Sequence, residues 1–509
     1  MGIFDKKKQY NRTVIKNSTK GFYFGATEAE GENVRNASLL DYFDDYLNIL
    51  DQLELGKFIF TGRKGVGKSA IAKFIKDSAD LTIDSYAKIL RVADFELEKT
   101  IQNSDSNVIK EKLVFEWLII VNIVKLIVEN DCGSYTTEYD KLKKFLNTNA
   151  GIVNIDEYEV VGGEKTKGGE VSFGGLKHVF GGVFKRYFKA SVNKAAFYKL
   201  IPPLREILKI ILDYDVNKDL EFWLLFDDLD INFNVNDESD NNKVMELIRV
   251  AKKYNNEIFK NNKAKVLIFI RDDIRDNLIP RYADSAKTFS TNEIFIDWYA
   301  SDNQIKSENE IPLKKLANKR IEVNFKNNKI DFNKDDPWES LFKKEQFEYG
   351  GKTSFKYILD FTFYRPRDII TFLNMMSTSN YVYPLTKNTV KSLLKKYIRV
   401  NITEIKSELN LFFTDDEINK IFTDIFQYII ANPNLKNVEL LEKIKALDFN
   451  LKPDKVLDLL SKYSLIILID QQHNLYFNYR ENTELAGINN DELNFTLPKC
   501  IYHNYRQIY

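Results

Sequence analysis

The feature that most constrains the fold is the stretch GRKGVGKSA at residues 62–70, which satisfies the pattern G-x-x-x-x-G-K-[ST]. An apolar run ends just before it at Phe60, and residues 70–76 have the spacing of an amphipathic helix. In a strand–loop–helix of this kind, glycine lets backbone N–H groups face an anion, and the helix N-terminus attracts negative charge. The sequence therefore predicts an α/β domain whose parallel sheet carries a phosphate-binding loop.

The loop residues have separate predicted roles. Lys68 is predicted to bridge the β- and γ-phosphates of a nucleotide, and Ser69 to bind Mg²⁺. The rest of the predicted cradle consists of Gly62, Arg63, Lys64, Gly65, Val66, Gly67 and Ala70.

A second apolar run, at residues 222–226, ends in Asp227 and Asp228. Five consecutive apolar residues are typical of a central parallel strand, whose carboxyl end would bring both acids to the phosphates. Asp227 is the predicted water-mediated Mg²⁺ ligand, and Asp228 is the predicted acid that activates water for hydrolysis. Because Lys68 and Asp227 are much further apart than a minimal core requires, we expect an insertion at about residues 98–215.

Further strands are predicted at residues 55–60, 89–95, 265–270 and 293–296. Strands that alternate with helical segments favour a parallel sheet with the nucleotide at its carboxyl edge. Arg271 follows one of these strands, and with Arg275 and Arg281 it is a candidate finger that reaches the nucleotide of a neighbouring subunit. Each of the three also fits a solvated surface arginine.

ATP is favoured over GTP. Residues 328–331 and 333–336 both match the guanine-reading signature N-K-x-D, but the chain is rich in Asn and Lys, so such matches arise easily. A GTPase would also carry D-x-x-G at the end of the acidic strand, and residues 227–230 read DDLD. The expected ligands are therefore ATP and Mg²⁺.

Composition limits the class of protein. Lys+Arg and Asp+Glu are equal at 74 each, so any contact with nucleic acid must be local. The two cysteines, Cys132 and Cys500, have no paired spacing, which excludes a disulfide scaffold and fits a reducing cytoplasm. The longest apolar stretch, 117–128, is too short to span a membrane and is expected to form a buried helix. We expect a cytoplasmic protein with no membrane partner.

Four stretches together resemble the AAA+ and STAND ATPases, whose bacterial members are often encoded beside phage-defence genes. They are GRKGVGKSAIAKF (62–74), LLFDDLD (224–230), VLIFIRDDIRDNL (266–278) and FYRPRDIITFLN (363–374). The stretch GFYFGATEAEGE (21–32) is similar to the segment that packs near the adenine in this group. The resemblance covers about residues 20–375.

The resemblance implies an ATPase that acts as a switch, assembles as a homo-oligomer and regulates a separate effector protein in antiviral defence. Asp228 stands where AAA+ proteins usually have Glu, which implies slow turnover. Arg365 or Arg367 would sense the γ-phosphate from a helical lid, because a guanidinium can hold phosphate oxygens bidentately. Equally, Arg365-Pro366-Arg367 reads as an ordinary helix start.

Four regions are expected: an N-terminal segment (1–54), a P-loop core (55–330), a helical lid (331–399) and a C-terminal domain (400–509). Within the insertion, the glycine-rich basic stretch 161–186 predicts a hairpin that could contact nucleic acid or a partner subunit.

The C-terminal domain has the pattern of a winged helix. Helices are predicted at 437–447 and 453–463, and a hairpin is predicted from 465–469 and 475–479. The second helix is nearly neutral, which favours protein contact over DNA reading. The alternative function is a DNA-binding replication or transposition regulator, and a third is a scaffold that binds ATP structurally.

Overall fold

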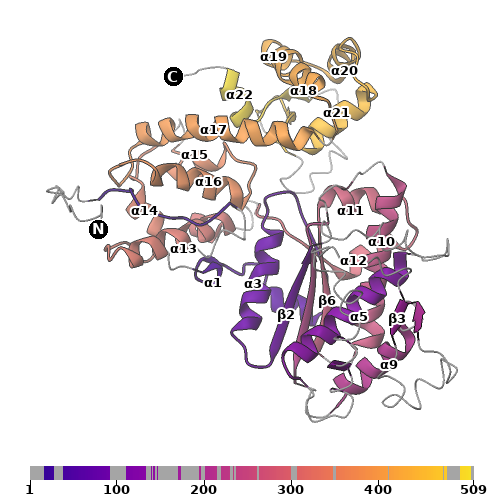
Figure 1. Cartoon of the computed structure of the whole chain (residues 1–509). Coiled ribbons are helices and arrows are strands. Elements are labelled where there is room, and N and C mark those ends of the chain that lie inside the picture. Colours follow the sequence, from indigo (N-terminus) through magenta and orange to yellow (C-terminus); the bar gives the residue numbers. More distant parts are fainter. Residues whose placement is uncertain are drawn as a thin grey trace, which may run out of the picture. The chain divides into compact units, whose positions relative to one another are not determined.

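The chain forms two compact units in the computed structural model (Figure 1). The sheet unit contains residues 28–30 and 45–297, and the helical unit contains residues 1–27, 31–44 and 298–509. The structure describes residues 17–27, 38–91, 111–132, 139, 142–143, 146, 170–172, 194–196, 201–214, 219–229, 233, 237–260, 263–299, 307–347, 351–410, 412–473, 475–477 and 493–505.

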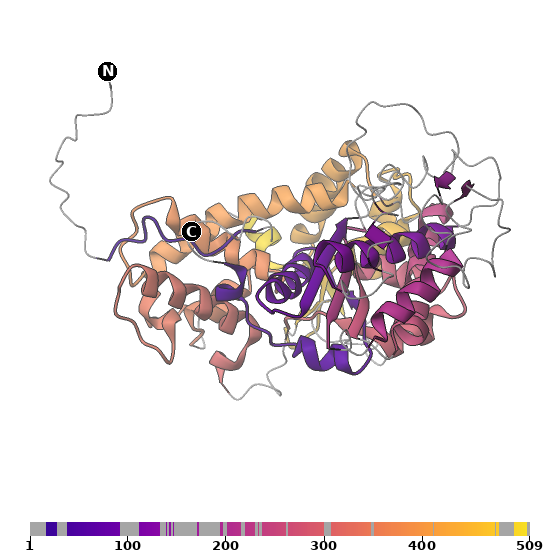
Figure 2. The ribbon, with the colours of Figure 1, turned by 60° about the horizontal axis from the view of Figure 1, so that its bottom comes forward.

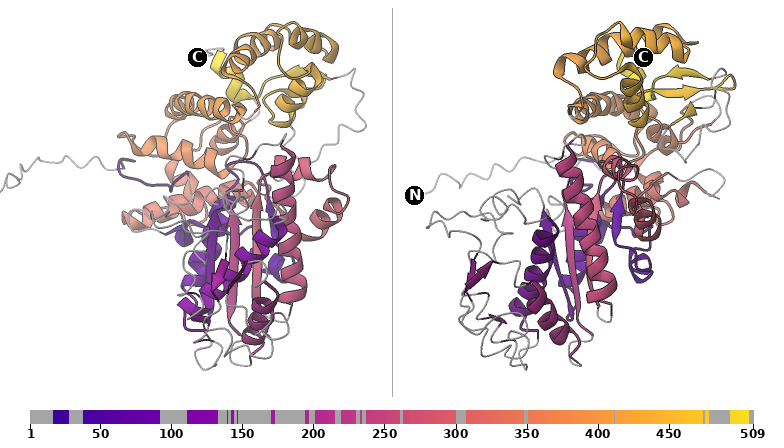
Figure 3. Two further views of the ribbon diagram at one scale, coloured as in Figure 1. Left: turned by 45° about the vertical axis from the view of Figure 1, so that its right-hand side comes forward. Right: turned by 90° about the vertical axis from the view of Figure 1, so that its right-hand side faces the viewer.

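The sheet unit is built on five parallel strands. Residues 222 and 224–226, and residues 266–270, are almost completely buried, which is typical of strands covered on both faces. Figure 3 shows helices on both sides of these strands. The predicted parallel α/β sheet is therefore confirmed. Across the sheet the order is β2 (Ser85–Arg91), β5 (Glu221–Asp227), β6 (Lys263–Ile270), β1 (Ile59–Thr61) and β7 (Glu293–Phe295).

The helices of this unit follow the hydrophobic pattern of the sequence. Residues 114–128 of α5 are all buried, as expected for a helix that is mostly apolar around its axis. This confirms the buried helix predicted at 117–128. The helices are α2 (Ile49–Glu54), α3 (Lys68–Asp80), α5 (Glu111–Glu129), α9 (Ile201–Leu212), α10 (Glu238–Lys253), the π-helical turn η5 (Tyr254–Ile258), α11 (Asp272–Leu278) and α12 (Ser285–Asn292).

The predicted basic hairpin at 161–186 lies outside the described residues, apart from β3 (Glu170–Ser172). This strand pairs antiparallel with β4 (Lys194–Ala196), so its partner lies beyond the glycine-rich stretch. The hairpin predicted within 161–186 therefore stays a prediction.

The helical unit holds the remaining elements. Its helix α17 (Lys387–Leu409) runs through the boundary predicted between 399 and 400, and the last helix packs against it. The predicted lid and C-terminal domain are therefore joined by continuous structure. The other helices are α1 (Leu39–Tyr42), η6 (Glu308–Glu310), α13 (Pro312–Asn327), α14 (Pro337–Leu341), α15 (Ser354–Leu359), α16 (Pro366–Ser377), α18 (Asp415–Lys420), η7 (Ile421–Ile425), α19 (Phe426–Ala431), α20 (Asn437–Lys445), α21 (Pro453–Lys462) and α22 (Lys499–Tyr505).

The C-terminal elements match the predicted pattern of two helices and a hairpin. Helices α20 and α21 lie where they were expected, and β8 (Ile467–Ile469) pairs antiparallel with β9 (Leu475–Tyr476). A third strand, β10 (Asn494–Thr496), pairs with the other edge of β8. Sequence analysis missed this strand, because three residues are too few to show a period. Among the described residues, no helix is both long and apolar enough to cross a membrane.

Candidate nucleotide-binding site

The glycine-rich loop lies between β1 and α3, as its sequence predicts. Gly65 and Gly67 have φ values of 83° and 99°, a region that side chains with a Cβ rarely enter. Gly62 is required for a different reason: a Cβ there would lie 2.8 Å from Val66 Cγ2 and 3.1 Å from the Ile296 carbonyl oxygen. The loop therefore needs glycine at three positions to keep its shape.

The N-terminus of α3 is suited to an anion. Gly67 is its N-cap residue and supplies no side-chain hydrogen bond to the first turn, whose N–H groups have no partner within a helix. Lys68 begins the helix, and its Nζ donates hydrogen bonds to the carbonyl oxygens of Gly62 (2.9 Å) and Arg63 (3.2 Å). The Lys68 cation therefore lies at the loop, next to a helix start whose N-cap residue offers no side-chain hydrogen bond. This combination of donors suits a phosphate group.

The two acids of β5 end at the same edge of the sheet as the loop. Phe226 pairs with Ile268 of β6, and two residues further on, Ile270 pairs with Thr61 of β1. Asp228 therefore comes level with the ends of β6 and β1. Since parallel strands share a carboxyl edge, Asp227 and Asp228 are on the side of the sheet from which the loop emerges.

Asp227 and Asp228 differ in their surroundings. Asp227 is only 3% exposed, whereas the side chain of Asp228 is 28% exposed and lies 3.4 Å from Nε of Arg91, at the end of β2. Asp228 also has φ = 56°, a strained left-handed conformation that Asp adopts more readily than most residues. Such strain at a strand end is typical of functional sites.

The residues present fit a magnesium nucleotide. Among the described residues, no group of three or more His, Cys, Asp or Glu side chains could hold a metal alone. Mg²⁺ bound with a nucleotide needs fewer protein ligands, because phosphate oxygens and water complete its coordination. One hydroxyl from Ser69 and one carboxylate from Asp227 would be the ligands from this chain.

The sequence analysis did not single out Asp272, which follows the end of β6. Its backbone N–H donates to the Gly62 carbonyl oxygen at 3.3 Å, so the residue is tied to the phosphate loop. Burial raises the pKa of the Asp272 carboxyl and Asp273 raises it further, while Arg63 and Lys68 of the loop oppose the shift. An ionisable carboxyl therefore lies within electrostatic reach of the loop cations. The signal in the sequence was its place directly after the strand and Arg271.

This shift predicts the pH dependence of stability. A carboxyl whose pKa rises on folding destabilises the folded state when it ionises. The protein is therefore not destabilised by Asp272 below the ordinary carboxyl pKa of 3.8, and it loses stability as the pH rises through the pKa of the folded state. We therefore expect Asp272→Asn to melt at a higher temperature than the wild type at pH 7, and the two proteins to converge near pH 4. Melting curves from pH 4 to 8 check this, with Asp51→Asn, an exposed carboxylate of α2, as the control. A stability difference that does not change with pH would contradict it.

The candidate finger arginines are mostly held within this chain. Arg271 is 5% exposed and makes two hydrogen bonds with Asp273, at 3.1 and 2.6 Å. Arg275 bonds Glu293 at 2.9 Å and Asp276 at 2.8 Å. A buried, paired guanidinium does not fit a finger that reaches a second subunit, so the prediction for Arg271 is not supported. Arg281 is exposed and is the better candidate.

The RPR segment lies in the helical unit, at the start of α16. Arg365 is its N-cap residue, and its guanidinium pairs with Asp368 at 3.0 and 3.2 Å and with Glu408 of α17 at 3.2 Å. These contacts favour the helix-start interpretation for Arg365. Arg367 is partly exposed, and its buried Nε has no hydrogen-bond partner. Arg367 is therefore the better candidate for a phosphate sensor.

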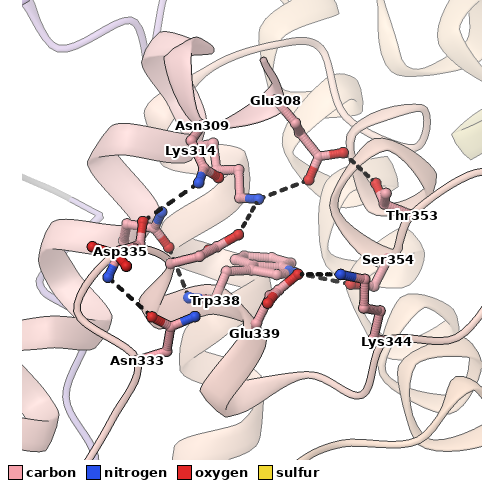
Figure 4. A network of polar contacts seen from close by, with 12 residues as sticks. Glu308, Asn309, Lys314, Asn333, Asp335, Trp338, Glu339, Lys344, Thr353 and Ser354 are labelled. Atoms are coloured by element: carbon pink, nitrogen blue, oxygen red, sulfur yellow. Dashed lines mark hydrogen bonds and ion pairs between the residues drawn. The ribbon is translucent and has the colours of Figure 1, made fainter.

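The two N-K-x-D matches have structural roles. Residues 328–331 follow the end of α13 in the helical unit. In the second match, the Asn333 side chain accepts a hydrogen bond from the Asp335 N–H at 3.0 Å, and Lys314 pairs with both Asp336 and Glu308 at 2.8 Å. Figure 4 shows the Lys314 side chain directed toward Glu308, and the Asn333 side chain directed toward Asp335. The contacts account for Asn333 and Asp336 without a guanine base.

Comparisons with known proteins give two likenesses. The chain is similar to the ORC2 protein of Aeropyrum pernix, solved as ADPNP-ADP complexes, with 11% sequence identity over 86% of this chain and 93% of that one and a TM-score of 0.39. No curated protein matches the sequence. A family model described as the FunZ-associated C-terminal helical domain matches residues 312–406. The helical unit is thus similar to that domain from α13 through most of α17.

Proposed function

We propose that this chain binds and hydrolyses ATP with Mg²⁺ and acts as a switch. One observation carries the proposal: Lys68, on a helix start without a side-chain cap, and the Asp227–Asp228 pair occupy the same carboxyl edge of one parallel sheet. Lys68 and the first turn of α3 would hold the phosphates, and Ser69 with Asp227 would hold Mg²⁺. Asp228 would orient and deprotonate the attacking water.

Oligomerisation, the effector protein and the roles of the two arginines are proposed from the resemblance of the motifs to AAA+ and STAND ATPases. The resemblance implies a switch that assembles as a homo-oligomer and regulates a separate effector protein. Arg367 would report the γ-phosphate, and Arg281 would be the finger offered to a neighbouring subunit. The slow turnover expected from Asp228 suits a switch better than a motor, and bacterial antiviral defence is the setting that the resemblance suggests.

The proposal is tested by Asp228→Asn. Asn is similar in shape and tolerates the left-handed conformation, so the variant removes the charge without disturbing the backbone. We expect ATP binding to persist and turnover to fall by about a hundredfold or more, the usual effect of removing a general base. Phosphate release and ATP affinity, measured side by side, distinguish the two steps.

A matched control lies at the other end of the same strand. Asp219 is exposed and precedes β5, so Asp219→Asn should leave turnover at the wild-type rate. No ATPase activity above background in the wild type would instead favour a scaffold that binds ATP structurally. Unchanged turnover in Asp228→Asn would exclude Asp228 as the residue that deprotonates the attacking water.

The second candidate function is a DNA-binding regulator. Helices α20 and α21 followed by the three-stranded sheet of β10, β8 and β9 favour it, because this is the pattern expected of a winged helix. The exposed charges of α21 include both signs, and Lys455 pairs with Asp458 at 3.0 Å, which weakens the attraction for phosphate. DNA affinity that falls steeply with salt would support this function, and no binding at low salt would exclude it.

A further inference from the structure

The helical unit contains a groove that holds an extended chain segment. Residues 17–25 lie along α13 and α16, two helices that pack together, and they form no regular element of their own. Figures 1 and 2 show this indigo segment running beside the helices. The match to the FunZ-associated helical domain covers both helices but begins at residue 312, so it includes the groove and not the segment within it.

The groove contacts the main chain of the segment from two sides. The Asn324 side chain of α13 accepts from the Tyr23 N–H at 2.7 Å and donates to the Tyr23 carbonyl oxygen at 2.6 Å. The Asn374 side chain of α16 accepts from the Phe24 N–H at 3.2 Å and donates to the Gly25 carbonyl oxygen at 2.8 Å. A side-chain amide that both accepts and donates in this way recognises backbone, whatever the residue that carries it.

The beginning of the segment is held as an added strand. Thr19 N–H donates to the Tyr381 carbonyl oxygen, and Tyr383 N–H donates to the Asn17 carbonyl oxygen, both at 2.9 Å. Ser18 and Val382 form the antiparallel bridge between these two bonds. Addition of a strand to an exposed backbone edge is a recurring mode of peptide recognition, in which main-chain bonds supply affinity and side-chain pockets supply specificity.

Two aromatic side chains supply that specificity here. Phe22 and Phe24 are 3% and 0% exposed, and Phe22 lies 5.8 Å from Phe325 and 5.7 Å from Tyr383, between ring centroids. Tyr23, between them, is only partly buried. Alternate residues of an extended chain point to the same side, so the groove selects aromatic residues spaced two apart.

We propose that the groove between α13 and α16 is a binding site for extended peptides with aromatic residues at positions i and i+2, and that residues 17–25 are its ligand within the chain. The inference goes beyond the proposed ATPase function and does not depend on it.

The test uses the full chain with a protease recognition sequence inserted after Gly31. After cleavage, the protein is mixed with a fluorescein-labelled peptide of residues 17–27, and binding is followed by anisotropy. We expect the labelled peptide to exchange into the groove and unlabelled peptide to displace it. Peptides carrying Phe22→Ala or Phe24→Ala should bind at least about tenfold more weakly, because each loses the binding free energy that burial of one aromatic ring supplies. A Lys20→Ala peptide is the matched control, because Lys20 is exposed, and should bind as the parent does.

Substitutions of groove residues provide a second test of the proposal. Asn324→Leu with Asn374→Leu should reduce peptide affinity, whereas Ser379→Ala, which leaves both asparagines in place, should not. Because the Phe→Ala changes are made in the peptide, the test stands even where the double variant fails to fold. The proposal is overturned if the original segment never exchanges, if the cut protein releases it and binds no labelled peptide, or if the Phe→Ala peptides bind as well as the parent.

Discussion

Lys68→Ala is expected to weaken ATP binding by about ten- to a hundredfold, because a charge-assisted hydrogen bond contributes about 1.5–3 kcal/mol and each 1.4 kcal/mol is a factor of ten. Two effects combine in this variant. The cation over the start of α3 is lost, and so are the hydrogen bonds from Nζ to the carbonyl oxygens of Gly62 and Arg63. The first effect removes attraction for the phosphates, and the second loosens the loop that should face them.

Titration calorimetry with Mg-ATP measures this loss directly, and melting curves with and without ATP give an independent value. Lys76→Ala is the matched control: Lys76 lies two turns further along α3, is partly exposed and pairs with Asp80 at 2.7 Å. Its effect on ATP affinity should be within experimental error. Wild-type affinity in Lys68→Ala would remove the basis of the nucleotide site.

The core of this site could be predicted from sequence because its determinants are local. The strand, the glycines, Lys68 and α3 are consecutive, and the turn chemistry of Gly65 and Gly67 permits few other conformations. The acidic strand was recognised only together with the loop, since an apolar run that ends in two carboxylates also fits a buried strand followed by an acidic turn. Both predictions were independent of the structure of the chain between the loop and the acidic strand.

The residues that could not be predicted from the sequence owe their roles to contacts between distant segments. Asp272 becomes notable only when the end of β6 is placed beside Gly62, and Arg91 only when β2 is placed beside β5. Asn324 and Asn374 look like ordinary polar residues of two helices until residues 23–25 lie between them. Long-range pairing of this kind leaves no periodic signal in the sequence.

The role of Arg365 also depends on a contact with a distant segment that the sequence does not reveal. Its sequence context, Arg-Pro-Arg before an amphipathic helix, fits a phosphate sensor and a helix start equally well. The structure adds Glu408, more than forty residues away on α17, as a second partner. Burial alone would lower the pKa of the Arg365 guanidinium, but Asp368 and Glu408 outweigh it and raise that pKa well above its ordinary value.

Arg365→Ala is therefore expected to destabilise the helical unit by about 3–5 kcal/mol, the range found when one partner of a buried ion pair is removed. Asp368 is 1% exposed and Glu408 is 11% exposed at the side chain, so both carboxylates would remain buried without their cation. The Asp368 carboxylate would keep its bond from the Phe363 N–H, which compensates only in part. Urea unfolding followed by circular dichroism measures the change.

Arg367→Ala is the matched control for this prediction, because it removes the same side chain two residues along the same helix. Arg367 is partly exposed, and no ion pair with another described residue holds it as Asp368 and Glu408 hold Arg365, so its loss should change the free energy of unfolding by about 1 kcal/mol or less. If Arg367 senses the γ-phosphate, that variant should instead lose ATP turnover. The opposite result, a stable Arg365→Ala without turnover beside a fully active Arg367→Ala, would assign the sensor to Arg365. That outcome would also require its bonds with Asp368 and Glu408 to open when nucleotide binds.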